Sequence, residues 1–276
     1  MDIDTLMKHE AFAVNHWNNT VVRRSSLLPE LLLAAIALSP HPAATQWKTP
    51  WSYAGPDGPE HWGDLDPAYA ACKNGRQQSP IDIRTAQRAQ LSALRFEYLT
   101  APLKYLINNG YTIRVNYHAP ISGGFLIVGD KRYQLTQFHF HRPSEEMIHG
   151  KRYDMVIHLM HESSGGQTTG VAILLRAGRA NATIEQLWNH MPMTKGDEHE
   201  IPGVQLNPAA LLPGDLSYYT YTGSLTAPPC DESVTWFILK TPVEVSQEQI
   251  NAFAKLYPHD VRPIQPLNGR IVKESQ

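Results

Sequence analysis

The chain has 276 residues, of which 42% are hydrophobic and 18% are charged. These proportions are typical of a globular protein with a full apolar core, divided into one large domain or two small ones. The formal net charge of −2 at pH 7 gives no indication of nucleic acid or an anionic membrane surface as a partner, because both favour a basic chain.

The region 1–45 differs from the rest of the chain and has the order of a secretory signal peptide. The pair Arg23–Arg24 precedes the apolar run 31–38 (LLLAAIAL), and the small-residue segment 39–45 (SPHPAAT) follows it. The apolar run is too short for a membrane span, which needs about 20 residues. We therefore expect cleavage after this segment, a mature domain over 46–276 and a periplasmic or secreted location. The alternative is an ordinary buried amphipathic helix.

The two cysteines of the chain, Cys72 and Cys230, lie far apart in the sequence. They do not form a C-x-x-C pair of the kind typical of cytosolic metal–thiolate sites. In an oxidising compartment, two such cysteines are best explained as one disulfide, and two unrelated buried thiols are the alternative.

From residue 46 onward, the pattern of apolar and polar residues favours β-strands over helices. Several segments alternate in the β manner, and one is continuously apolar, as expected for a strand covered on both faces. Helix candidates are short, with Thr183 as an expected N-cap and Ser246 with Gln249 as an expected capping box. We expect a single, mostly β domain with short peripheral helices. The expected strands are 111–117, 125–129, 133–141, 155–161, 170–175 and 233–239, and the expected helices are 66–72, 183–190 and 246–256.

Closely spaced histidines indicate a metal site. His139 and His141 stand two positions apart in QFHFHRPSEE, and on a β-strand this spacing points both imidazoles at one place. In MVIHLMH, His158 and His161 lie on opposite faces, so this strand supplies only one further ligand. Three neutral histidines with a fourth position open to water are the catalytic arrangement for zinc.

The same segment also fits a different metal site. His139, His141 and Glu145 form H-x-H-x₃-E, which resembles the metal motif of cupin barrels. In a cupin, Glu145 would bind the metal directly, and iron or manganese would be preferred. Residues far from this segment decide between the two interpretations.

Five segments together resemble the alpha-class carbonic anhydrases of the bacterial secreted or periplasmic type, and the similarity runs from about Trp51 to Arg270. The resemblance implies a single domain with a twisted, mostly antiparallel central sheet, short peripheral helices and a conical cleft ending at zinc. It also implies reversible hydration of CO₂ to bicarbonate and a proton, by attack of zinc-bound hydroxide, with activated esters as side substrates. The segments are GPEHWGDLDPAYAACKNGRQQSPIDI (58–83), INNG (107–110), QFHFHRPSEE (137–146), YYTYTGSLTAPPCDESVTW (218–236) and RPIQPLNGR (262–270).

The resemblance assigns roles to residues around the metal. Thr226 matches the threonine whose hydroxyl accepts a hydrogen bond from zinc-bound hydroxide, and Glu145 matches the carboxylate that accepts the proton of that threonine. Gln137 matches the amide that orients the first histidine through its other ring nitrogen. Three histidines match the zinc ligands: His139, His141 and His158.

The resemblance also implies a substrate pocket and a disulfide. Leu225, Val234 and Trp236 match the hydrophobic wall beside the metal that receives CO₂. Without the resemblance, Val234 and Trp236 are an ordinary core-facing stripe of a strand. Cys72 and Cys230 match the disulfide of secreted members.

Three positions depart from the family pattern. Tyr111 occupies the place of the usual proton-shuttle histidine, and tyrosine, with a pKa near 10, accepts a proton poorly at neutral pH. Val156 replaces a glutamate that bonds the free ring nitrogen of His158 in many members. We expect that nitrogen to find another partner, such as a backbone carbonyl, and zinc affinity to fall by one or two orders of magnitude. Ala227 replaces a frequent threonine and is expected to alter anion affinity.

These departures define what we expect of the activity. Turnover should be slower and more dependent on buffer than with a histidine shuttle, unless another histidine such as His61 or His118 exports the proton. The expected partners are CO₂, water and bicarbonate, with no nucleic acid and no membrane span. A non-catalytic zinc-binding protein on the same fold is the alternative function, and the survival of all three ligand histidines argues against it.

Overall fold

The structure is a computed structural model, and all the residues that it describes belong to the unit Trp47–Gln276. The expected signal region 1–45 and His118 lie outside the described residues. Among the described residues, no helix is long and apolar enough to cross a membrane. The described ranges are 49–117, 123–196 and 198–276.

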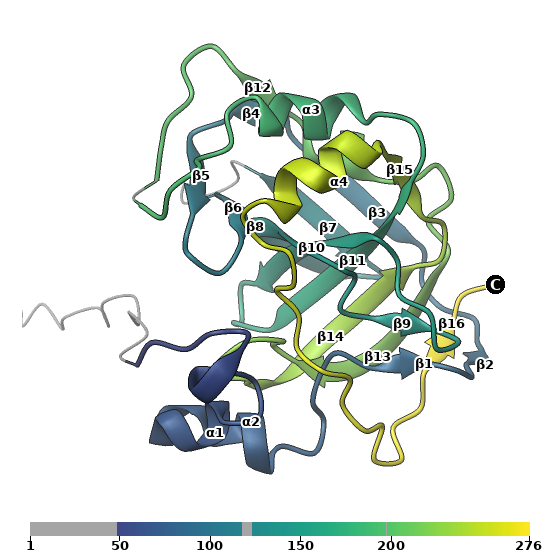
Figure 1. Ribbon diagram of the computed structural model, residues 1–276. Coiled ribbons are helices and arrows are strands. Elements are labelled where there is room, and N and C mark those ends of the chain that lie inside the picture. The colour runs from purple at the N-terminus through teal and green to yellow at the C-terminus, as the bar shows by residue number, and fades with distance from the viewer. Residues whose placement is uncertain (1–48, 118–122, 197) are drawn as a thin grey trace, which may run out of the picture. The chain divides into compact units, whose positions relative to one another are not determined.

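A 12-stranded mixed sheet forms the framework of the described part of the chain (Figure 1). Its strands are β2 (Gln87–Arg88), β3 (Leu94–Tyr98), β5 (Tyr105–Asn108), β6 (Ile113–Asn116), β7 (Gly124–Val128), β8 (Lys131–His141), β10 (Met155–Ser163), β11 (Thr168–Ala177), β13 (Tyr218–Ser224), β14 (Glu232–Leu239), β15 (Val243–Val245) and β16 (Lys273–Glu274).

The strand order is β2-β16-β13-β14-β11-β10-β8-β6-β5, with β15 paired to β11 and β7 paired to both β8 and β3. Most pairings are antiparallel, including β8 with β10 and β10 with β11, whereas β11 runs parallel to β14 and β15. Two small sheets accompany the large one: β1 (Asp82–Ile83) with β9 (Met147–Ile148), and β4 (Ala101–Pro102) with β12 (Gln205–Leu206). The expected mostly β fold class is confirmed.

The helices are short and peripheral, as expected. Figure 1 shows α3 and α4 side by side, and α1 and α2 at another end of the fold. The α-helices are α1 (Trp62–Leu65), α2 (Ala71–Asn74), α3 (Ala182–Trp188) and α4 (Gln247–Ala254), and the 3₁₀ turns are η1 (Gly55–Asp57), η2 (Pro67–Tyr69) and η3 (Pro208–Leu211).

Local side-chain chemistry explains where the elements begin. The capping box expected at Ser246 and Gln249 is present at the start of α4. The expected N-cap of α3 is wrong: the cap is Asn181, whose side-chain oxygen accepts from the N–H groups of Thr183 and Ile184. Asparagine reaches these unpaired N–H groups from a position before the helix, so the threonine is a donor to the cap.

The strand expected over 111–117 is shorter than predicted. It begins at Ile113, because the side-chain oxygen of Asn109 accepts from the N–H groups of Tyr111 and Thr112 and closes a turn there. Gly110, with φ +85°, supplies the left-handed conformation of that turn. The remaining expected strands are present as β7, β8, β10, β11 and β14, each with slightly shifted ends.

The two faces of β8 are used differently. Phe138 and Phe140 point into the larger apolar cluster, where Phe140 contacts Trp188 of α3 and Phe253 of α4. Alternation along the strand turns His139 to the opposite face. Apolar packing under the helices therefore fixes which side of the sheet carries the histidines.

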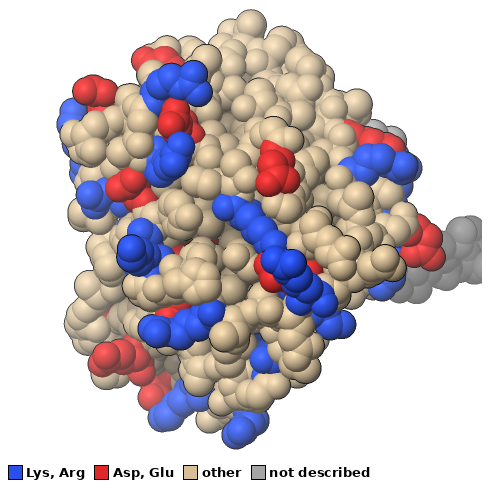
Figure 2. Space-filling view, turned by 90° about the vertical axis from the view of Figure 1, so that its right-hand side faces the viewer, with Lys and Arg blue, Asp and Glu red and all other residues tan. Residues whose placement is uncertain are grey.

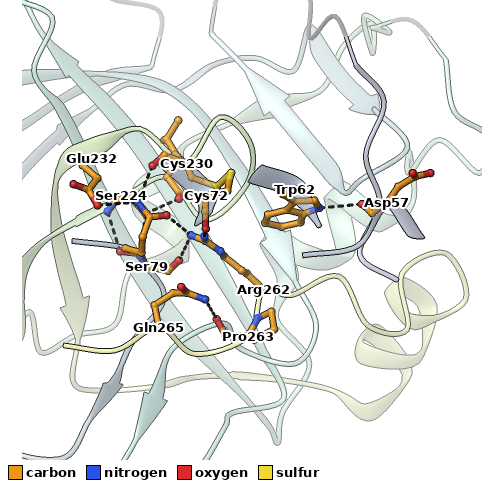
Figure 3. Close-up of a disulfide and its surroundings, with 12 residues drawn as sticks. Asp57, Trp62, Cys72, Ser79, Ser224, Cys230, Glu232, Arg262, Pro263 and Gln265 are labelled. Carbon is orange, nitrogen blue, oxygen red and sulfur yellow. Dashed lines mark hydrogen bonds between the residues drawn. A yellow bond between two sulfur atoms is a disulfide. The ribbon is translucent and has the colours of Figure 1, made fainter. Parts of the chain in front are cut away.

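A disulfide joins the segment around α2 to the chain before β14. Cys72 and Cys230 are bonded, as expected. Beside them, the Arg262 guanidinium is 1% exposed and donates to the carbonyl oxygens of Cys72 and Ser79, at 2.9 Å in each case (Figure 3). The covalent bond and the buried arginine thus hold three distant parts of the chain together.

The charged side chains of the surface are mixed in sign. Figure 2 shows basic and acidic residues interspersed over the face that it draws. Among the charged residues of the surface, Arg176 and Arg179 pair with Glu244. Exposed pairs of this kind contribute little to stability, so packing and the disulfide dominate.

Removal of the disulfide should destabilise the fold substantially. The bond closes a loop with a sequence separation of 158, for which the chain-entropy model gives a contribution of about 5 kcal/mol. We expect Cys72→Ala/Cys230→Ala to lower the free energy of unfolding in urea by up to this amount. The reduced wild type is the control and should approach the double variant. A loss below about 1 kcal/mol would contradict the expectation.

A buried histidine on the far side of β10 should make the protein sensitive to acid. His161 is 1% exposed, its Nε2 lies 2.6 Å from the hydroxyl oxygen of Tyr98, and burial lowers its pKa to about 3. The unfolded chain binds this proton near pH 6.5, so stability falls as the pH drops from about 6.5 towards 3. We expect the stability of His161→Gln, measured by urea unfolding between pH 5 and 7.5, to depend less on pH than that of the wild type. Equal slopes would contradict this account.

Candidate metal centre

Three histidines bring one ring nitrogen each to a common point. His139 and His141 come from β8, and His158 comes from the adjacent strand β10, directly opposite His139 in the antiparallel register. Their ligand atoms all lie within 4.8 Å of one another. The ligand set expected from the sequence is therefore assembled by the fold. His161, on the other face of β10, takes no part in it, as the strand period requires.

Hydrogen bonds hold the two β8 imidazoles in one orientation. Nδ1 of His139 lies 2.8 Å from Oε1 of Gln137, and Nδ1 of His141 lies 2.7 Å from the backbone oxygen of Asp260. Carbonyl oxygens only accept, so each Nδ1 carries the proton and each Nε2 keeps a free lone pair. Nε2 of His141 is buried and has no hydrogen-bond partner. The expected role of Gln137 matches this geometry.

The third imidazole is held by a residue that the sequence did not single out. Nε2 of His158 lies 3.1 Å and 3.4 Å from the two carboxylate oxygens of Glu146, and both residues are fully buried. Nδ1 of His158 is left buried and unpartnered. The expectation that this nitrogen finds a partner other than residue 156 is confirmed, but the partner is a carboxylate from the neighbouring loop and not a backbone carbonyl. The expected loss of zinc affinity therefore has no structural basis.

The electrostatics of the cluster favour neutral imidazoles at two positions. Desolvation and the neighbouring histidines lower the pKa of His139 well below its usual range and that of His141 to about 3. Burial would also lower the pKa of His158, but the charge and hydrogen bond of Glu146 raise it above its ordinary value. Metal binding requires deprotonated ring nitrogens, so burial favours the binding form of the first two rings, whereas Glu146 favours the protonated form of the third.

Glu145 lies beside the histidines without joining them. Its Oε1 accepts from the backbone N–H of Arg262 at 2.9 Å, and the Thr226 hydroxyl interacts with the same carboxylate. Oε2 is buried without a hydrogen-bond partner, 3.5 Å from Nε2 of His141 and 3.8 Å from Nδ1 of His158. Burial raises the pKa of this carboxyl to about 7, against the lowering effects of His158 and of the Arg262 N–H.

A cavity of about 180 Å³ opens onto the three histidines. Leu225, Ala227 and Trp236 line it, as expected for an apolar wall. Val234 does not: it packs in the apolar cluster that contains Trp236 and borders a separate hollow. For Val234, the core-facing interpretation is the better one. The polar lining includes Asn109 and Thr112, from the turn between β5 and β6, and Gln137 of β8.

Aromatic and basic groups also lie in or beside this cavity. The ring of Tyr111 stacks on Trp51, with centroids 4.0 Å apart, and Nζ of Lys195 lies 5.5 Å from the Tyr111 ring centroid. Arg114 pairs with His139 across β6 and β8 and lines the cavity. Among the described residues that line it, the only histidines are the three that converge, and His61 borders a different hollow.

Sequence reasoning missed four residues of this site. Arg114 could be found only by knowing the β6–β8 register, and Asp260 acts through a backbone oxygen that carries no sequence signal. Trp51 lies before the first motif, in a segment without periodicity. Glu146 was missed because the resemblance assigns a role only to its neighbour Glu145.

The donor set fits a zinc ion. Neutral imidazoles suit zinc, and two of the converging nitrogens are buried atoms with no other partner. Three histidines on a large mixed sheet, beside a cavity, form the kind of metal centre that the resemblance to the carbonic anhydrases implies.

Comparisons with known proteins agree with this class. The family model for the eukaryotic-type carbonic anhydrases matches residues 57–276, and the chain belongs to this family of enzymes. The cupin interpretation is therefore wrong.

Bacterial relatives are similar over most of their length. A carbonic anhydrase of Klebsiella pneumoniae is 42% identical over 87% of this chain and 97% of its own, and one of Nostoc sp. is 40% identical over 82% and 86%. The solved structure of the alpha-carbonic anhydrase of Thermovibrio ammonificans, in complex with the inhibitor sulfanilamide, superposes with a TM-score of 0.77. It is 41% identical and covers 83% of this chain and 99% of its own.

Proposed function

We propose that this chain catalyses the reversible hydration of CO₂ to bicarbonate and a proton, with zinc held by His139, His141 and His158. The observation that carries the proposal is the convergence of their ring nitrogens within 4.8 Å, while each second nitrogen is fixed by a neighbour. Zinc bound in this way lowers the pKa of a coordinated water and so supplies a nucleophile at neutral pH.

Thr226 and Glu145 would select and orient that nucleophile. A threonine hydroxyl has one proton, and Oε2 of Glu145 is the buried acceptor still lacking a partner. When Thr226 donates to it, only lone pairs of the hydroxyl face the cavity. Thr226 then accepts a hydrogen bond from an incoming water and discriminates against ligands without a proton to donate. The N–H of Arg262 keeps the carboxylate in place from the other side.

The apolar wall would receive CO₂. A small molecule without a net dipole gains little from polar groups, and the side chains of Leu225, Ala227 and Trp236 offer an apolar surface next to the histidines. Ala227 adds no hydroxyl, which favours release of the bicarbonate product. Activated esters, which also carry an electrophilic carbonyl, are proposed as side substrates.

Proton export is the step in which this chain should differ from relatives with a histidine shuttle. Tyr111 stands at the shuttle position, stacked against Trp51. A neutral phenol accepts a proton poorly at neutral pH. We therefore propose that dissolved buffer removes the proton through the open mouth of the cavity.

The site is proposed to work outside the cytoplasm. The disulfide between Cys72 and Cys230 is typical of oxidising compartments, and the region 1–45 has the order of a signal peptide. We propose that a mature domain over 46–276 is periplasmic or secreted.

The variant Glu145→Gln shows whether the carboxylate of Glu145 supports Thr226 or binds the metal directly. Glutamine keeps the shape but accepts the Thr226 proton less strongly, so we expect full zinc content and a fall in CO₂ hydration of about a hundredfold. Stopped-flow hydration and zinc analysis on one sample give both results. His141→Ala is the matched control and should lose zinc. Loss of zinc in Glu145→Gln would instead place the carboxylate on the metal.

The wild type in the same experiment tests the whole proposal. Fast hydration that disappears when a chelator strips the zinc, and returns when zinc is added, is the expected result. One zinc per chain without hydration would favour a non-catalytic zinc-binding protein.

Tyr111→His tests the proton route. At low buffer concentration the variant should turn over CO₂ about tenfold faster than the wild type, and the difference should shrink as buffer is added. Tyr111→Phe, which removes the hydroxyl and keeps the stacked ring, should behave like the wild type. Equal rates for all three proteins at low buffer concentration would show that another group exports the proton.

A further inference from the structure

The imidazole of His158, the third histidine of the proposed zinc site, is held by a loop residue and not by a residue of its own strand. On β10, position 156 precedes His158 by two residues and shares its face. Val156 is fully buried and packs in the apolar cluster with Leu174 and Tyr221. Its side chain has no polar atom, so β10 offers the imidazole nothing at this position.

A carboxylate reaches the same imidazole from the loop between β8 and β9. Oε1 of Glu146 lies 3.1 Å from Nε2 of His158, and both side chains are 0% exposed. A buried carboxylate is costly unless it is paired and hydrogen-bonded, so its persistence at this place requires a compensating partner. His158 is that partner.

The backbone around Glu146 is firmly held. Its carbonyl oxygen accepts from the Ser144 hydroxyl at 2.7 Å, and the same hydroxyl oxygen accepts from the N–H of Tyr153. The next residue, Met147, begins β9 and donates its N–H to the carbonyl oxygen of Ile81. The loop therefore presents the carboxylate at a fixed position and does not depend on a flexible side chain alone.

We propose that Glu146 is a positioning residue for the zinc site, which takes over at position 146 the role that the family's frequent glutamate would have at position 156. Its carboxylate accepts the Nε2–H of His158, fixes the ring orientation and leaves the Nδ1 lone pair facing the other two histidines. The inference rests on the proposed zinc site and adds to it an exchange between two positions that are ten residues apart in sequence (156 − 146).

The exchange predicts that the two positions are coupled. A carboxylate at either position can hold the ring, but two carboxylates there would be like charges in a space without solvent. Without a carboxylate at either position, the Nε2–H of His158 would be buried and without a hydrogen-bond acceptor. Glu146→Ala or Val156→Glu alone should therefore weaken zinc binding or lower the stability of the fold. The two substitutions together should restore the zinc affinity that Glu146→Ala loses.

Zinc affinity is the direct test, measured by competition with a chelator on the full chain. We expect Glu146→Ala to bind zinc about ten- to a hundredfold more weakly than the wild type. Val156→Glu alone should bind no more tightly than the wild type and should unfold at a lower temperature. Glu146→Ala/Val156→Glu should recover at least tenfold of the lost affinity. Glu162→Ala, at an exposed glutamate of β10, is the control and should bind like the wild type.

A second variant guards against a general loss of folding. Glu146→Gln keeps the size of the side chain and removes its charge, and it should weaken zinc binding about tenfold. In the zinc-loaded protein, the Nε2–H signal of His158 in nitrogen-15 NMR should shift in this variant while those of the other two ligands stay in place.

Two results would overturn the inference. One is wild-type affinity in both Glu146→Ala and Glu146→Gln, and the other is a double variant that binds no better than Glu146→Ala. Zinc binding is read independently of catalysis, so a wild type that binds zinc without hydrating CO₂ would refute the proposed activity and leave this test intact. A wild type that binds no zinc would refute both.

Discussion

The antiparallel register between β8 and β10 is the constraint on which the site depends. It sets His158 opposite His139, and the two-residue period of β8 adds His141 on the same face. A shift of β10 by one residue would turn His158 to the other side of the sheet, away from the two β8 histidines. The register is protected by the apolar packing of Phe138 and Phe140 beneath the helices, so the core that stabilises the fold also places the histidines.

Convergence alone does not make a metal site, because each ring must also present the correct nitrogen. Three acceptors achieve this from separate parts of the chain: an amide on β8, a backbone oxygen near the C-terminus and a loop carboxylate. The buried Arg262 donates from its guanidinium to the carbonyl oxygen of Cys72, beside the disulfide, and its backbone N–H holds Glu145. The covalent cross-link and the chemistry of the cavity are thereby linked through one residue.

Local rules of the sequence were enough for part of this picture. The His139–His141 pair and the main strands follow from alternation, and the capping box of α4 follows from side-chain chemistry. Contacts that depend on tertiary geometry were not accessible. The contact of Glu146 with His158 needs the path of a loop, and Asp260 contributes an atom that every residue possesses. Val234 shared a strand pattern with Trp236, but a pattern of period two cannot say where a cavity ends.

Anomalous diffraction at the zinc edge, on crystals of the zinc-loaded protein, tests the central claim most directly. The account predicts one zinc per chain, bound by Nε2 of His139, Nε2 of His141 and Nδ1 of His158, with no protein carboxylate on the metal. Zinc bound by the carboxylate of Glu145 or Glu146, or through Nε2 of His158, would contradict it.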